Sequence, residues 1–155
     1  MANTLGMGQA LPADAIADYI LVDKARHELT LLREGRVLKT YQVSLGSGGP
    51  GPKRIEGDRK VPEGLYRIAG RNPKSGFHWA LRLSYPEQRN IDQARALGKP
   101  PGGDVMIHGL RNGTGWLGRL HLLFDWTYGC IAVTDPEMDE LWRAVPDGTP
   151  IEILP

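Results

Sequence analysis

The chain has 155 residues, with 19 Lys or Arg against 18 Asp or Glu, so its formal net charge is +1. This length fits one domain, and the balanced charge argues against a protein that binds nucleic acid through phosphate contacts. The hydrophobic fraction of 41% and the charged fraction of 24% are typical of a globular protein. The 20 glycines and 12 prolines indicate many turns and few long helices.

The N-terminal region carries no targeting signal that the sequence can identify. Residues 1–17 lack the basic start and apolar centre of a secretory signal, so we expect a flexible N-terminal segment there and no export signal in this chain. No stretch approaches the roughly 18 uninterrupted apolar residues that a membrane helix needs. We therefore expect no membrane segment.

Short apolar or alternating runs separated by turns predict a β-rich domain. Residues 27–43 form a hairpin candidate with a three-residue connection at 33–35, and the Gly-rich stretch 46–52 is expected to be a flexible loop. The expected strands cover residues 18–23, 27–32, 36–43, 65–68, 79–83, 104–108, 130–133 and 149–153.

Two short helices are expected beside these strands. One runs from Asn90, a candidate N-cap, to Leu97. The other follows Thr134, which forms a capping box with Glu137 and is followed by apolar residues at helical spacing. The elements together predict a mainly β fold, a mixed β-sheet sandwich or barrel with two or so short peripheral helices.

Cys130 is the only cysteine, so the chain can form neither an internal disulfide nor a paired-thiol zinc site. A lone cysteine is most often a small buried hydrophobe, and that interpretation stays open. However, Gly129 precedes it and Ile131 begins an apolar strand, which places the thiol where a loop meets a rigid scaffold. A thiol near its reference pKa of about 8.5 needs a base to become a nucleophile.

His108 is the best candidate for that base, because it ends an apolar strand just before Gly109. A satisfied core histidine is the alternative. A zinc site from His108, His121 and Cys130 is chemically conceivable, but nothing in the spacing recommends it. We expect no metal and no other cofactor.

Four segments in order resemble the L,D-transpeptidase (YkuD-like) catalytic domain family. Ile107-His108-Gly109 is followed, 18 residues later, by Thr127-Tyr128-Gly129-Cys130-Ile131. Residues 57–66, Tyr85-Pro86 and the approach to His108 over 102–109 also fit, so the resemblance covers residues 18–154 and defines a catalytic domain over 18–155. The chain departs from the family pattern in having Tyr128 in place of His, Ala132 in place of Asn or Arg, and Val61 in place of Thr.

The resemblance implies a cysteine-dependent L,D-transpeptidase that acts on peptidoglycan stem tetrapeptides. Cys130 would be the nucleophile, releasing D-Ala through a thioacyl-enzyme and then forming a cross-link, and His108 would be the general base and acid. The Gly109 carbonyl would orient His108, and the backbone amides of Tyr128 and Gly129 would form the oxyanion hole. The residues expected to contact the stem peptide are Thr127, Tyr128, Arg111, His121, Trp126 and Tyr85.

The same resemblance implies a bacterial monomer in the periplasm or cell envelope that serves peptidoglycan biosynthesis, cell wall biogenesis and cell shape. Three alternatives remain open. The thioacyl-enzyme could be resolved by water, giving an L,D-carboxypeptidase, or the enzyme could be an endopeptidase. The domain could also be a non-catalytic peptidoglycan-binding module, since fold alone does not guarantee chemistry.

Overall fold

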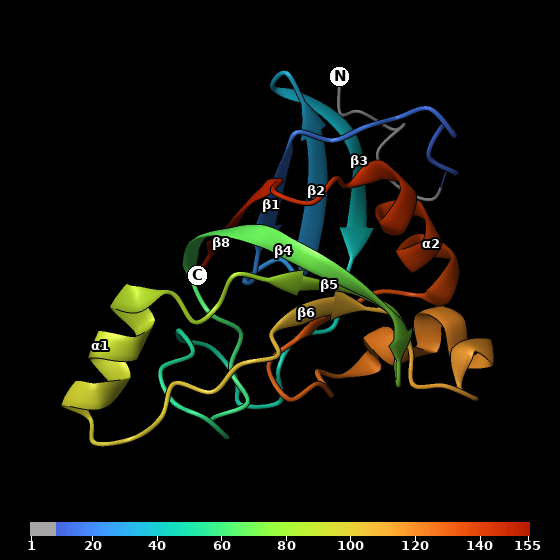
Figure 1. Cartoon of the computed structure of the whole chain (residues 1–155). Coiled ribbons are helices and arrows are strands. Elements are labelled where there is room, and N and C mark those ends of the chain that lie inside the picture. The colour runs from blue at the N-terminus through green and yellow to red at the C-terminus, as the bar shows by residue number, and fades with distance from the viewer. Residues whose placement is uncertain (1–8) are drawn as a thin grey trace.

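Residues 9–155, which the computed structural model describes, form one mixed eight-stranded sheet with the order β3-β2-β1-β8-β4-β5-β6-β7 (Figure 1). This arrangement confirms the expected mainly β fold with a few short helices. The strands are β1 (Tyr19–Asp23), β2 (Glu28–Arg33), β3 (Arg36–Gln42), β4 (Gly64–Ser75), β5 (His78–Leu83), β6 (Met106–His108), β7 (Ile131–Ala132) and β8 (Pro150–Leu154).

Most neighbouring strands pair antiparallel, and two pairs are parallel. The first three strands form antiparallel hairpins, and β1 pairs in parallel with the C-terminal β8. The long β4 bridges the two halves of the sheet, because it pairs with β8 over its first residues and with β5 over the rest. The second parallel pair, β6 with β7, closes one edge of the sheet. The hairpin connection expected at 33–35 is shorter than predicted, because Glu34 and Gly35 alone link β2 to β3.

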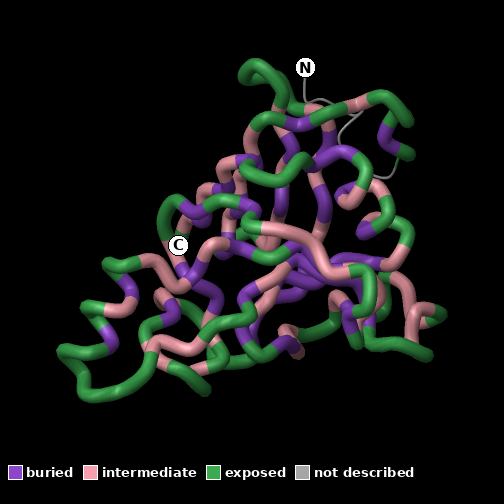
Figure 2. The backbone as a smooth tube through the Cα atoms, in the orientation of Figure 1, coloured by how far each residue is buried: buried purple, intermediate pink, exposed green. Residues whose placement is uncertain are grey.

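The core lies against one face of the central strands. Alternate residues of β1 and β8 are fully buried, as period-two alternation in a half-buried strand requires, and Figure 2 shows the buried stretches following the strands. Each such aliphatic side chain contributes roughly 1.5–3 kcal/mol on burial. The fully buried aliphatic residues of these strands and of β2 are Ile20, Val22, Leu29, Leu31, Ile151 and Ile153.

Helix α2 (Asp135–Ala144) has the predicted capping box between Thr134 and Glu137. Met138 and Leu141 of its apolar face are fully buried, and the helix packs against β5. Figure 1 shows α2 and α1 at opposite sides of the sheet in this view. The two helices therefore flank the sheet, as expected.

Helix α1 (Gln88–Ala96) begins earlier than predicted, because its N-cap is Glu87, three residues before Asn90. Asn90 instead holds the third helical position, where its side-chain oxygen accepts a hydrogen bond from the Glu87 amide at 2.9 Å. Residues 115–123, for which the sequence predicted no helix or strand, form the 3-10 segment η2 (Gly115–Leu123), which is kinked at Gly118. None of the described helices is long and apolar enough to span a membrane.

The expected flexible segment at 1–17 lies partly outside the described residues, which begin at residue 9. Its later part packs on α2: Leu11 and Ala17 are buried, and the Leu11 amide donates to Glu140 at 2.7 Å. Arg143 in turn donates to the Leu11 carbonyl at 3.1 Å. Leu11 and Ala17 are therefore attached to the domain, while most of the residues between them are exposed.

Glu140 of α2 is the centre of a buried polar cluster. Its carboxylate accepts hydrogen bonds from the Lys39 ammonium at 2.6 Å and the Tyr41 hydroxyl at 3.0 Å, in addition to the Leu11 amide. The Lys39 and Glu140 side chains are only 8% and 13% exposed. This ion pair ties α2 to β3 and to the N-terminal segment.

Replacing Glu140 with alanine is expected to lower the free energy of unfolding by about 3–5 kcal/mol, because it leaves a buried ammonium without a counter-charge. Urea denaturation measures the change. The matched control is Arg26→Ala, which removes an ion pair whose Arg26 side chain is 74% exposed, and the expected change is under about 0.5 kcal/mol. Similar losses in both variants would contradict this account.

Candidate active site

The pairing of β6 with β7 brings His108 and Cys130 onto neighbouring backbone segments. In this parallel pair His108 lies opposite Ala132, and Cys130 is two residues before Ala132. Residues two apart in an extended chain share a face, so the register of this pair predicts that the Cys130 and His108 side chains lie on the same face of the sheet edge. The Val133 amide donates to the His108 carbonyl at 3.0 Å, which fixes the register of the two strands.

The turn before Cys130 is held by the hydroxyl of Thr127. Its oxygen accepts hydrogen bonds from the amides of Gly129 at 3.2 Å and Cys130 at 3.0 Å, and the hydroxyl donates to the Cys130 carbonyl at 2.7 Å. Thr127 is itself buried. The expectation that Thr127 contacts the stem peptide is therefore corrected: its polar atoms are used to fix the backbone around the cysteine.

Gly129 and Gly46 let three backbone segments pack in direct contact beside this turn. Gly129 has φ +121, and a Cβ atom there would lie 2.9 Å from the Lys60 carbonyl oxygen. A Cβ atom at Gly46 would lie 2.1 Å from the Arg59 carbonyl oxygen and 3.2 Å from the Gly129 Cα atom. Side chains are therefore excluded from this interface, which holds the 58–60 segment against the cysteine turn.

The hydrogen bonds of the cysteine turn also bear on the expected oxyanion hole, because they occupy one of its two amides. The Gly129 amide is already a donor to Thr127, so it is not free to bind an oxyanion. No hydrogen bond of the Tyr128 amide is found within residues 9–155. The Tyr128 ring is 73% exposed, and the Arg59 guanidinium lies 4.5 Å from its centroid.

His108 is buried and oriented by its neighbours. Its Nδ1 atom lies 2.7 Å from the Gly109 carbonyl oxygen, so the proton resides on Nδ1 and the lone pair on Nε2. The Phe77 ring stacks on the imidazole with centroids 4.5 Å apart, and the Trp126 ring lies at 5.8 Å. Burial lowers the pKa of His108 to about 4, although the hydrogen bond to Gly109 opposes this shift.

The Cys130 thiol is partly exposed and donates a weak hydrogen bond to the Asp104 carbonyl, with 3.4 Å between sulfur and oxygen. Burial raises the pKa of Cys130 to about 11, and the Asp104 charge also raises it. A backbone hydrogen bond at Met106 and the Lys53 charge act in the opposite direction. A thiol with a raised pKa beside an imidazole with a lowered pKa is a neutral pair at neutral pH. Burial therefore favours the neutral thiol and neutral imidazole over a thiolate–imidazolium ion pair.

Lys53 and Asp58, which the sequence reasoning missed, organise the loop beside the cysteine. The buried Lys53 ammonium donates to the Asp58 carboxylate at 3.0 Å and to the Ile55 carbonyl at 3.1 Å. Burial alone would raise the pKa of Asp58, but hydrogen bonds from the Arg54 and Ile55 amides, Lys53 and the Lys60 amide hold it below its ordinary value. The sequence feature that could have pointed to Asp58 is the Gly57-Asp58 pair at the start of the segment 57–66, which resembles the family pattern.

The Gly-rich stretch expected to be a flexible loop is largely fixed to its surroundings. The Ser47 amide donates to the Thr127 carbonyl at 2.9 Å, and the Gly48 amide donates to the Arg59 carbonyl at 2.8 Å. These backbone contacts connect the start of the stretch both to the cysteine turn and to the 58–60 segment, while residues 47–50 are exposed.

Tyr85 does not face a substrate groove. It is 4% exposed within the core, its hydroxyl donates to the Pro101 carbonyl at 2.7 Å, and its ring meets Tyr66 edge-on at 5.9 Å. Burial raises the pKa of Tyr85 to about 12, so the phenol stays neutral. The expectation that Tyr85 contacts the stem peptide is therefore corrected.

Arg111, His121 and Trp126, also expected to contact the stem peptide, line an apolar pocket of about 480 Å³. Neither Cys130 nor His108 lines this pocket. Trp126 connects the two regions, because its ring packs near His108 and its indole nitrogen donates to His121 Nδ1 at 3.3 Å. Within residues 9–155, no group of three or more His, Cys, Asp or Glu could hold a metal ion.

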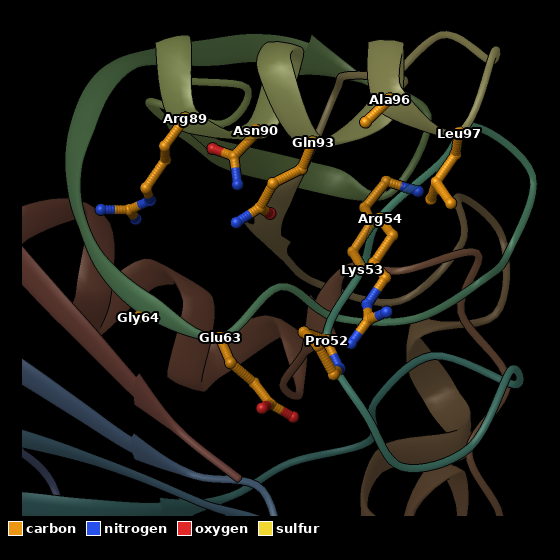
Figure 3. A pocket seen from close by; sticks show the side chains of 10 residues that line it. All are labelled: Pro52, Lys53, Arg54, Glu63, Gly64, Arg89, Asn90, Gln93, Ala96 and Leu97. Atoms are coloured by element: carbon orange, nitrogen blue, oxygen red, sulfur yellow. The ribbon is translucent and has the colours of Figure 1, made fainter.

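A second hollow of about 620 Å³ lies between α1 and the 52–64 segment. Figure 3 shows Arg89, Asn90 and Gln93 of α1 on one side of it, facing Lys53, Arg54 and Glu63. Asn90 is buried and donates to the Tyr66 hydroxyl at 3.0 Å, so its amide is already satisfied. Lys53, which lines this hollow, is also the cation whose charge opposes the rise in the pKa of Cys130.

Comparison with known proteins identifies the family to which these residues belong. The model of the YkuD family, the L,D-transpeptidase catalytic domain, matches residues 17–153. The chain belongs to this family. The resemblance that the sequence motifs suggested is thus confirmed. The "Putative L,D-transpeptidase YafK" of Escherichia coli K12 is 30% identical over 133 residues, which cover 82% of this chain and 46% of that protein.

Solved structures share the fold. The helical cell shape determining protein Pgp2 of Campylobacter jejuni, 25% identical, superimposes with a TM-score of 0.66 over 90% of this chain and 47% of that chain. L,D-transpeptidase 1 of Mycobacterium tuberculosis, 18% identical, gives a TM-score of 0.54 over 88% of this chain and 60% of that chain. The chain spans about half the length of the curated relative and of Pgp2.

The lowered pKa of His108 predicts that acid destabilises the fold. Between pH 6.5 and about 4 the unfolded chain binds more protons than the folded one, so stability is lost as the pH falls through this window. A pKa lowered from 6.5 to about 4 corresponds to roughly 3 kcal/mol. Denaturation at a series of pH values should show that the unfolding free energy of His108→Gln falls less steeply with decreasing pH than that of the wild type. His121 is expected to account for the pH dependence that remains, because burial lowers its pKa as well. An unchanged pH dependence in His108→Gln would contradict the assignment to His108.

Thr127→Val keeps the side-chain shape but removes the hydroxyl that satisfies two amides and one carbonyl. We expect a loss of about 2 kcal/mol in unfolding free energy and faster hydrogen exchange at the Gly129 and Cys130 amides. Thr127→Ser, which retains the hydroxyl, is the control and should stay close to the wild type. Equal protection of the two amides in both variants would show that the hydroxyl does not hold the turn.

Proposed function

We propose that the domain is a cysteine-dependent L,D-transpeptidase that acts on peptidoglycan stem tetrapeptides. Two observations support the proposal: the parallel register that pairs His108 with Ala132, two residues after Cys130, and the contact of His108 Nδ1 with the Gly109 carbonyl at 2.7 Å. The family acts on the cell wall, and we place this chain's activity in the periplasm or cell envelope. We take residues 18–155 as the catalytic unit, active as a monomer.

The first half-reaction follows from the protonation states of the resting pair. As the Cys130 sulfur attacks the carbonyl carbon of the third stem residue, its proton passes to Nε2 of His108, which carries the lone pair. The Tyr128 amide is the donor available for the developing oxyanion. The carbon–nitrogen bond to D-Ala then breaks, His108 returns the proton to the leaving amine, and a thioester to Cys130 remains.

The second half-reaction reverses these roles. An acceptor amine loses a proton to His108 as it attacks the thioester carbon, the bond to sulfur breaks, and the thiol regains its proton. A cross-link is the product. Water in place of the amine gives carboxypeptidase activity, and attack on an existing cross-link instead of a tetrapeptide gives endopeptidase activity, with the same two side chains in each case.

The neutral resting pair explains how the site avoids nonspecific reaction. A thiol with a pKa near 11 carries little thiolate at neutral pH, so an untethered electrophile meets a weak nucleophile. A bound stem peptide is held next to the sulfur, and the proton transfer to His108 accompanies attack instead of preceding it. Positioning of the substrate therefore supplies much of the rate.

The test is incubation of the protein with purified sacculi and disaccharide-tetrapeptides, followed by separation of the muropeptides. Cys130→Ala and His108→Ala are each expected to reduce D-Ala release by roughly a thousand-fold or more. The control is His27→Gln, which changes a half-exposed histidine paired with Asp125, away from the proposed chemistry. Its turnover should stay near that of the wild type.

The products decide between the related reactions. New cross-linked dimers support transpeptidation, tripeptides without dimers show hydrolytic trimming, and the disappearance of existing dimers shows an endopeptidase. Undiminished D-Ala release by Cys130→Ala would exclude the cysteine mechanism. Binding of the wild type to sacculi without any change in the muropeptides would identify a non-catalytic binding module.

A further inference from the structure

Residues 111–124 form an exposed apolar surface beside the site. The segment, orange in Figure 1, lies below α2 in that view. It contains two arginines, one histidine and no acidic residue. Four of its large apolar side chains are well exposed: Trp116 at 79%, Leu120 at 58%, Leu123 at 78% and Phe124 at 68%. We call these four residues the η2 patch.

A pocket of about 480 Å³ opens among the same side chains. Its polar lining residues are Arg111, Thr114 and His121, and the rest of its wall is apolar: Leu110, Leu117, Leu120, Leu123, Phe124 and Trp126. A wall of this composition suits an aliphatic chain and offers little to a charged stem peptide. The pocket and the η2 patch form one continuous surface, because they share Leu120, Leu123 and Phe124.

His121 has a buried hydrogen-bond donor without an acceptor. Its side chain lies in this wall and is only 6% exposed, and Nε2 has no partner within residues 9–155. The Trp126 indole can only donate, and it donates to His121 Nδ1, so the ring proton is on Nε2. A buried N–H without an acceptor is unfavourable. Because the fold covers this nitrogen, the unpaired N–H is a cost within the pocket wall and is not a contact offered to an occupant.

We propose that the η2 patch and its pocket bind the surface of a bilayer containing anionic phospholipid. The exposed Trp, Leu and Phe side chains enter the region between headgroups and acyl chains, and one acyl chain enters the pocket. Arg111 and Arg119 flank the patch and meet the lipid phosphates. Exposed aromatic and aliphatic residues with arginines are the composition of interfacial segments.

The charge and shape of the surface favour a lipid over a protein partner. The four patch side chains are mostly exposed and so project from the fold, which suits insertion between lipids. No acidic residue of 111–124 opposes an anionic surface. The acids nearest to the segment already have partners. Asp125 is held by His27 at 2.8 Å and by the Leu45 amide at 2.9 Å, and Asp135, which lies against Gly115, accepts a hydrogen bond from the Leu110 amide at 2.8 Å. The inference rests on this surface alone and does not depend on the proposed enzymatic activity.

The experiment is co-sedimentation of the full chain with vesicles of phosphatidylethanolamine and phosphatidylglycerol, compared with vesicles of phosphatidylcholine alone. We expect binding to the anionic vesicles that weakens as salt is raised. Leu123→Asp and Trp116→Ala should each weaken binding roughly ten-fold or more. The matched control is Leu97→Asp, at an apolar residue that is 54% exposed after α1 and should bind as the wild type does. Circular dichroism checks that each variant is folded.

Three results would overturn the proposal. The wild type could remain in the supernatant with every vesicle, or Leu97→Asp could weaken binding as much as Leu123→Asp. Sedimentation velocity could instead reveal a dimer that Leu123→Asp dissociates, which would make the patch a contact between protein chains. Because Cys130→Ala should bind vesicles like the wild type, failure of the lipid proposal is separable from failure of the proposed function.

Discussion

The parallel pairing of β6 with β7 is the constraint on which the proposed chemistry depends. β7 has only two residues, too few to be stable as an isolated pair, and it is held on its other side by Ser44, whose amide and carbonyl both bond Ala132, at 3.0 and 2.9 Å. The Thr127 hydroxyl then fixes the turn that leads into it. This short strand can therefore position the Cys130 sulfur, because hydrogen bonds to β6, to Ser44 and to the Thr127 hydroxyl hold its backbone and the turn before it.

The same enclosure sets the electrostatics of the site. Burying the imidazole and the thiol together favours the neutral form of each, which moves their pKa values in opposite directions, to about 4 and about 11. Lys53 is the buried cation that opposes this for the thiol, and its own charge is matched by Asp58. The loop around Asp58 thus has two roles: it packs its backbone against Gly46 and Gly129, and it holds a positive charge near the sulfur.

The sequence predicted most strands and α2 because period-two alternation and the Thr134 capping box are local signals. It predicted His108 and Cys130 because their motifs lie in order along the chain. The sequence could not predict that the Thr127 hydroxyl accepts a hydrogen bond from the Gly129 amide, since that bond depends on the backbone angles of the turn. Tyr85 was misassigned because an aromatic residue near a motif gives no indication of burial. Lys53 was missed because its pairing with Asp58 forms only when the loop folds back.

Trp126 links the two surfaces that the structure presents. One side of its ring system lies near the His108 imidazole, and its indole nitrogen is the partner of His121 in the apolar pocket. Phe77 completes the arrangement, because it stacks on His108 and lies 5.9 Å from Trp126. Close-packed side chains transmit a displacement of one member to its neighbours. The orientation of His108 and the shape of the apolar pocket therefore share one side chain, and a change at Trp126 must alter both surfaces at once.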